Sequence, residues 1–211
     1  HTLTTFPLDD VNINYNHTVP VNLNQQELDQ YNPEDLSAPQ FWDFSLEYYK
    51  YSDSAELMLE LQNSHNLDVN LILFSLWIGS CHGSRLEQTH FHILDNAIEG
   101  WRANITQPLR NIRQSCKHLG DLDATTRNSF AKMAANIEIR SEHACQAILT
   151  RQLFNLENIK NISDPSIAAS KNLNAYFAYS GTTKTGKILN IRHRLIELTR
   201  EYLSQHAAYS L

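Results

Sequence analysis

The chain contains 211 residues, of which 42% are hydrophobic, and it carries a formal net charge of −6 at pH 7. This is enough apolar material for one core, and the acidic balance disfavours a general nucleic-acid-binding protein. No run of about 18 apolar residues is present to span a membrane. Three cysteines, an odd number, make no disulfide framework and indicate a reducing compartment, so we expect a cytoplasmic protein. The charge is uneven, with −10 over residues 1–60 and +4 over residues 61–211.

Residues 1–36 differ in composition from the rest and are expected to form an extended acidic arm, rich in asparagine and proline. Two short pieces alternate apolar and polar residues, which is typical of an extended segment with one buried face. The alternates Val11, Ile13 and Tyr15 should therefore face a contact, either on another subunit or on the same chain. The chain begins at His1 without a basic stretch followed by an apolar one, so we expect no signal peptide, and further residues upstream.

Residues 37–211 show helical periodicity and form the second predicted unit, a helical domain. Ser37 is the expected N-cap of the first helix, and Asp53 or Ser54 is that of the second. Asp68 should cap the third helix. Each of these residues has a side-chain oxygen that can accept a hydrogen bond from a backbone N–H in the first turn.

The third helix, about residues 69–78, is apolar on every face. At about 1.5 Å per residue it is too short for a bilayer, so it is predicted to be the central buried helix. Residues 79–84 are expected to break the helical pattern. A fourth helix should follow over about 86–103, and a fifth should begin at Thr106 and close at Gly120.

Asp123 is the expected start of the longest helix, whose apolar residues recur at helical spacing. They are Phe130, Met133, Ile137, Ala144 and Ile148. Asp164 and Pro165 signal another helix, which should end at Gly181, and the last should occupy about residues 186–206. These make about eight helices with no credible core strand. The sequence predicts an all-α fold, a compact bundle around the central helix.

Motifs for catalysis, cofactors and metals are weak. Residues 181–187 match the first seven positions of a phosphate-binding P-loop, but Ile188 follows instead of Ser or Thr, and no strand is expected before it. Cys and His residues that are close in sequence are adjacent or two positions apart, and side chains two apart on a helix face opposite ways. We therefore expect no catalytic residue, no cofactor and no metal.

Two basic features have more support as binding surfaces. Arg110, Arg113 and Lys117 are spaced to form one helical stripe, and Lys187, Arg192 and Arg194 make the last helix cationic. Solvated helix faces are the commoner outcome for such patterns. The functional interpretation is an acceptor surface for an acidic partner, including the acidic arm of the same chain.

Several blocks of sequence resemble a family of small, all-helical proteobacterial proteins known chiefly as a domain of unknown function. They are PQFWDFSL at 39–46, LQNSHNLDVNL at 61–71, LWIG at 76–79, Trp101 with QPLR at 107–110, and AASKNLNAY at 168–176. The resemblance covers about residues 37–205 and implies a compact cytoplasmic helical protein with no assigned reaction. The long arm departs from the family pattern and suggests a member built into a larger assembly, such as a bacterial type IV secretion coupling complex.

We therefore predict a non-enzymatic helical adaptor, or accessory subunit, in a complex with other protein subunits. No nucleic acid, membrane span or small-molecule substrate is expected. The alternative is a small enzyme, or a metal- or ligand-binding protein, with a pocket between helices near His65, Asp68, Asn70 and Trp77. In the more ordinary interpretation of these residues, Asp68 is an N-cap and Asn70 is exposed or hydrogen-bonded to backbone.

Overall fold

The central helix expected from composition is α4 (Val69–His82). The computed structural model describes residues 40–118, 120 and 123–207, and in it every residue of α4 up to Ser80 is buried. Asp68 caps this helix, since its side chain accepts hydrogen bonds from the backbone N–H groups of Asn70 and Leu71 at 2.8 and 3.1 Å. The all-α prediction is confirmed.

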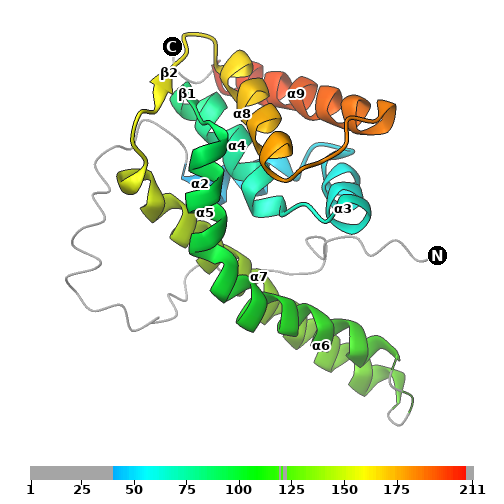
Figure 1. The fold of residues 1–211 in the computed structure, drawn as a ribbon. Coiled ribbons are helices and arrows are strands. Elements are labelled where there is room, and N and C mark those ends of the chain that lie inside the picture. Colours follow the sequence, from blue (N-terminus) through cyan, green and yellow to red (C-terminus); the bar gives the residue numbers. More distant parts are fainter. Residues whose placement is uncertain (1–39, 119, 121–122, 208–211) are drawn as a thin grey trace.

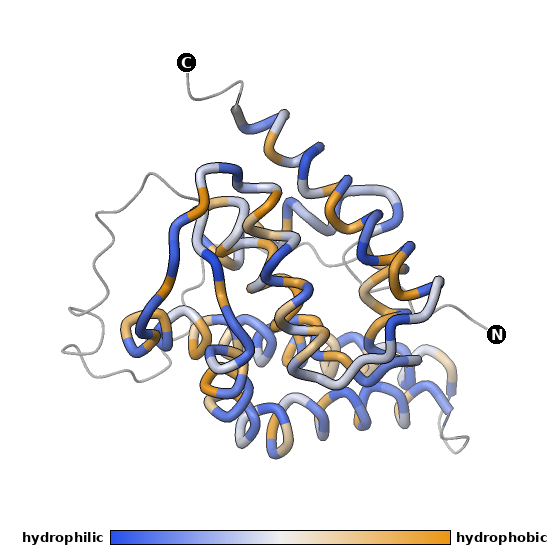
Figure 2. The backbone as a smooth tube through the Cα atoms, turned by 45° about the horizontal axis from the view of Figure 1, so that its top comes forward, coloured by the Kyte–Doolittle hydropathy of each residue, from blue (hydrophilic) through white to orange (hydrophobic). Residues whose placement is uncertain are grey.

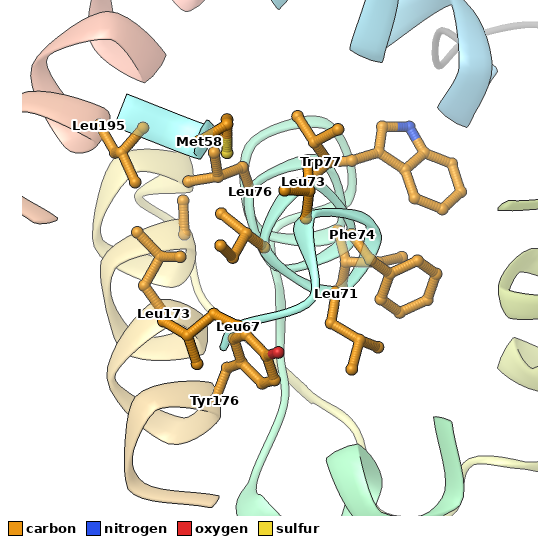
Figure 3. Packing of buried hydrophobic residues seen from close by; sticks show 14 of the residues in the cluster. Met58, Leu67, Leu71, Leu73, Phe74, Leu76, Trp77, Leu173, Tyr176 and Leu195 are labelled. Atoms are coloured by element: carbon orange, nitrogen blue, oxygen red, sulfur yellow. The ribbon is translucent and has the colours of Figure 1, made fainter. Parts of the chain in front are cut away.

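Besides the long helix α7 (Ala124–Gln152), five helices pack against α4 (Figure 1). They are α2 (Phe41–Tyr48), α3 (Ser54–His65), α5 (Gln88–Trp101), α8 (Pro165–Tyr179) and α9 (Gly186–Ala207). Hydrophobic and hydrophilic residues alternate along the surrounding helices (Figure 2), so each can turn an apolar side inward. Figure 3 shows α4 side chains beside Leu173 and Tyr176 of α8 and Leu195 of α9. We refer to α2–α5, α8 and α9 as the body.

The remaining elements connect and extend the body. They are β1 (Ser84–Arg85), the π-helical segment η1 (Arg102–Thr106), α6 (Gln107–His118), α7 (Ala124–Gln152), the 3-10 turn η2 (Leu153–Asn155) and β2 (Lys160–Asn161). The two short strands pair antiparallel, with Ser84 opposite Asn161. The helices α6 and α7 form a hairpin that extends away from the body (Figure 1), and no residue of α6 is buried. None of the described helices is long and apolar enough to cross a membrane.

The predicted break at residues 79–84 begins too early, because α4 continues to His82 and ends at Gly83 with φ 60°, before α5 starts at Gln88. Gly79 instead lets α4 and α8 approach each other. A Cβ at Gly79 would lie 2.2 Å from the backbone nitrogen of Ala169 in α8. Glycine here is needed for close helix packing, a role that local sequence does not distinguish from a helix stop.

The predicted start of a new helix at Thr106 is also wrong, since α5, η1 and α6 follow one another without interruption. Thr106 is buried, and its hydroxyl accepts a hydrogen bond from Ser141 Oγ at 3.0 Å. Pro108 has no N–H to continue the helical ladder, and the wider π turn directly precedes it.

The long helix begins as predicted, with the Asp123 side chain accepting from the N–H of Thr126 at 3.0 Å. However, three of the apolar residues predicted for its buried face are not in the core. Phe130, Met133 and Ile137 are 52%, 49% and 53% exposed. The predicted N-cap at Ser37 and the arm of residues 1–36 lie outside the described residues.

Candidate functional site

A pocket of about 480 Å³ lies where the body meets the base of the hairpin. Its walls come from α2, the α3–α4 turn, the first turn of α4, α5, η1, the start of α6, α7 and the end of α8. The structure thus has a pocket next to two of the four residues near which the sequence placed the alternative pocket. Asp68 and Asn70 line the cavity, but His65 and Trp77 are not among its lining residues.

One side of the pocket is formed by an Arg102 guanidinium shared between two aspartates. Arg102 Nη1 lies 3.0 Å from Asp68 Oδ2 and 2.8 Å from Asp95 Oδ1. Two tyrosines of α8 complete this side. Tyr179 donates its hydroxyl to Asp95 Oδ2 at 2.9 Å, and Tyr176 Oη accepts from the backbone N–H of Asp68 at 2.8 Å. Asp68 therefore caps α4 with one oxygen and pairs with Arg102 through the other.

The other side is lined by Arg110 of α6 and Glu142 of α7, and Arg113 and Glu138 extend this ionic cluster beyond the pocket. Arg110 contacts Glu138 at 3.1 Å and Glu142 at 2.8 Å, and Arg113 Nε contacts Glu138 at 2.5 Å. Because Arg110 and Arg113 are three apart and the glutamates four apart, each pair occupies one helix face. These contacts join the two helices of the hairpin at its base.

A buried chain of amides extends this network into the body. Asn70 Nδ2 donates to Glu142 Oε2 at 2.6 Å, and Gln146 Nε2 donates to Asn70 Oδ1 at 3.0 Å and to Ser45 Oγ at 3.1 Å. The expectation that Asp68 is an N-cap is confirmed. The expectation for Asn70 is wrong, since it is 7% exposed and bonds to side chains of α7. Only the packing of α7 against α4 brings these partners together.

Burial raises the pKa of the Glu142 carboxyl to about 7. Arg110 opposes this shift by favouring the charged form, whereas the negative charge of Asp68 adds to it. Burial also raises the pKa of the Cys145 thiol and of the Tyr176 phenol well above their ordinary values. The thiol is therefore protonated at neutral pH and is a poor nucleophile.

The structure separates the two basic groups that sequence analysis proposed for partner binding (Figure 1). Arg110 and Arg113 point into the hairpin and pair with α7 glutamates, while Lys117 is exposed near the end of α6. Their role toward an acidic partner stays a prediction.

The predicted basic residues of α9 also have partners within the chain. Lys187 pairs with Glu60, Arg192 donates to Ser170 Oγ at 3.2 Å, and Arg194 contacts Asp53. The predicted arm residues Val11, Ile13 and Tyr15 lie outside the described part of the chain.

A second feature that sequence reasoning did not identify is an apolar surface on the hairpin. Ile112 of α6 is 52% exposed, as are the α7 residues Phe130, Met133 and Ile137 to similar extents. Ile112 and Ile137 directly precede Arg113 and Glu138, which contact each other across the hairpin. Since the helices are antiparallel, one step back along each turns both side chains to the same side of the hairpin, about 3 Å apart along its axis. We call these four residues the hairpin face.

These features describe an all-helical protein with a mixed-charge pocket and a projecting two-helix hairpin. Residues 40–149, just over half of the chain, match the family model described as "Protein of unknown function (DUF2390)", and the chain belongs to this family. The match covers α2 to α7 except the end of α7, and so includes most of the pocket and the hairpin face. Neither a curated protein nor a solved structure matches the chain.

Proposed function

We propose that the protein is a helical adaptor whose hairpin face binds an acidic, amphipathic helix of a partner protein. The observation that carries this proposal is the exposure of four large apolar side chains on one side of a hairpin that projects from the body. Contiguous exposed apolar residues on a soluble protein are typical of protein–protein interaction sites, and single ones are not.

The charges around the hairpin face favour an acidic partner. Helix α6 contains no Asp or Glu, and the only acidic residues of α7 are Glu138 and Glu142, which face Arg110 and Arg113. The exposed basic residue Arg140 lies three positions after Ile137 and seven after Met133, so it borders the hairpin face. A partner helix with an apolar stripe bordered by carboxylates would match both the hairpin face and its rim. This keeps the predicted acidic partner but changes the residues that would contact it.

Site-specific photo-crosslinking in cells of the source organism tests the proposal. The crosslinker p-benzoylphenylalanine is placed at position 133 or 137, and at position 189 as a matched control. Leu189 is 43% exposed but lies on α9, away from the hairpin. We expect positions 133 and 137, but not 189, to crosslink to one separate protein through a peptide with acidic residues at helical spacing.

Charge-reversal variants distinguish specific binding of an acidic partner from nonspecific hydrophobic binding. Arg140→Glu should weaken the crosslink, and Phe130→Asp should abolish it, while circular dichroism remains that of the wild type because these side chains are exposed. Lys132→Glu, two positions from Phe130 and so on the other side of α7, is the matched control and should leave the crosslink unchanged. A crosslink to residues 1–39 of the same chain, a crosslink between two copies, or equal crosslinking from position 189 would overturn the adaptor proposal.

The larger assembly stays a prediction from the sequence. A type IV secretion coupling complex is the expected example, and the acidic residues 1–36 are the proposed second contact within it. The identity of the crosslinked protein tests this expectation directly.

A further inference from the structure

We propose that the pocket between the body and the hairpin binds a small organic cation, with its charged group against Asp68 and Asp95. This proposal is independent of the hairpin face. It assigns a ligand class to a cavity of about 480 Å³, a volume in the ordinary range for small-molecule sites.

The first argument is an excess of negative charge. Three carboxylates line the pocket, on Asp68, Asp95 and Glu142, against two guanidiniums, on Arg102 and Arg110. Arg113 and Glu138 form a balanced pair outside the lining. An uncompensated charge is costly in a partly buried site, so a proton or a bound cation should balance it.

The second argument locates this excess. On the α6–α7 side, two arginines face two glutamates. On the other side, the single Arg102 nitrogen Nη1 serves both Asp68 and Asp95. The surplus carboxylate therefore lies beside Arg102, and a second positive charge is best accommodated there.

The third argument concerns the kind of cation. Four aromatic side chains line the pocket: Trp42, Tyr49, Tyr176 and Tyr179. Aromatic rings favour an ammonium group carried on an apolar body. Among the described residues, no three His, Cys, Asp or Glu side chains are placed to hold a metal ion. The pocket therefore suits an organic amine better than a metal ion.

The proposal predicts that ligand binding is coupled to a proton. Several titratable groups act on the Glu142 carboxyl: Arg110 of α6, Asp68 before α4, Glu138 and Cys145 of α7, and Tyr49 after α2. A cation beside Asp68 offsets the negative charge that helps to raise the pKa of Glu142. Binding should therefore release part of a proton near pH 7, and affinity should rise with pH.

Calorimetry with a matched set of probes tests the proposal. Phenethylamine, which is an ammonium ion at pH 7, is compared with the neutral 2-phenylethanol and the anionic 3-phenylpropanoate. We expect saturable binding of the ammonium, at least about tenfold weaker binding of the alcohol, and weaker binding still of the carboxylate. Repeating the titration in two buffers of different ionisation enthalpy should reveal proton release.

Three variants connect the result to the pocket. Asp95→Asn should weaken ammonium binding about tenfold and leave alcohol binding unchanged. Glu142→Gln should abolish proton release but retain ammonium binding. Glu157→Gln, which removes a negative charge at an exposed position outside the pocket, should change neither. Absence of saturable ammonium binding, binding of the alcohol or carboxylate as tight as that of the ammonium, or no effect of Asp95→Asn would overturn the proposal.

Discussion

The body and the hairpin differ in where their large apolar side chains lie, in the core or on the surface. Phe74 in α4 is fully buried, whereas Phe130 in α7 is 52% exposed, although both lie in helices with recurring apolar residues. In the body, helices meet through apolar side chains, and Gly79 permits backbone contact. At the base of the hairpin, they meet through Arg–Glu pairs. Helical periodicity thus identifies an apolar face, and tertiary packing decides whether that face is covered.

A phenylalanine-to-alanine substitution should change the free energy of unfolding much more in the body than in the hairpin. Phe74→Ala leaves a cavity in the core and is expected to lower the free energy of unfolding by about 3–5 kcal/mol. Phe130→Ala removes an exposed ring and should change it by less than about 0.5 kcal/mol. Urea denaturation of both variants measures the difference. A large loss for Phe130→Ala would mean that the hairpin face is covered within the chain.

Glycine substitutions test the close packing of the body. Gly79→Ala forces α4 away from α8, because the three nearest atoms all belong to the backbone of Ala168 and Ala169, and should cost about 3 kcal/mol. Gly100→Ala in α5 meets no atom within 4 Å and should stabilise the protein by about 0.5–1 kcal/mol. Thermal unfolding of the two variants should therefore shift in opposite directions. Similar shifts would contradict the close approach of α4 and α8.

The pH dependence of stability should report on Glu142, where the hairpin joins the body. Its pKa is about 7 in the folded protein, against about 4.3 in an unfolded chain, so between these values the folded state binds more protons. This contribution to stability is present at low pH and is lost as pH rises toward 7. Relative to Glu142→Gln, the wild type should lose roughly 2–3 kcal/mol over this range.

Denaturation of both proteins between about pH 4.5 and about pH 7.5 measures this loss. Glu157→Gln, at an exposed position, serves as the control and should run parallel to the wild type. If the stability of Glu142→Gln changes with pH in the same way as that of the wild type, the Glu142 carboxyl does not have a raised pKa.

Helix caps should give the smallest and most local effects. Asp164 caps α8 and Asp123 caps α7, and each accepts backbone N–H bonds near 3 Å. Asp164→Ala should lower global stability by about 1 kcal/mol, because α8 packs on α4. Asp123→Ala should mainly accelerate hydrogen exchange in the first turns of α7. If both variants lose protection from hydrogen exchange equally across the body, the hairpin and the body unfold as one unit.

Most helix positions could be predicted because their signals are local. Asp68, Asp123 and Asp164 cap helices as expected, since each lies within three residues of the N–H groups it binds. The apolar composition of α4 likewise predicted its central place. The same local reasoning was wrong at Gly79, where the neighbouring atom belongs to a residue 90 positions later in the chain.

The candidate site could be predicted only in part. Asp68 and Asn70 were noticed as polar residues at the start of an apolar helix. However, their partners Arg102 and Glu142 are 34 and 72 positions away in sequence. The basic stripe at Arg110 and Arg113 was identified correctly as one helix face. Its contact with Glu138 was not predicted, because spacing within α6 does not indicate which helix packs against it.

The sequence by itself determined that the chain is helical, where most helices begin, and which helix is central, because caps and periodicity act over a few residues. Only the tertiary structure decided that Gly79 is a packing residue, that two arginines and three carboxylates from distant helices line one pocket, and that Phe130 stays exposed. Those outcomes depend on contacts between distant helices. Their energies come from desolvation and packing, which no single helix contains.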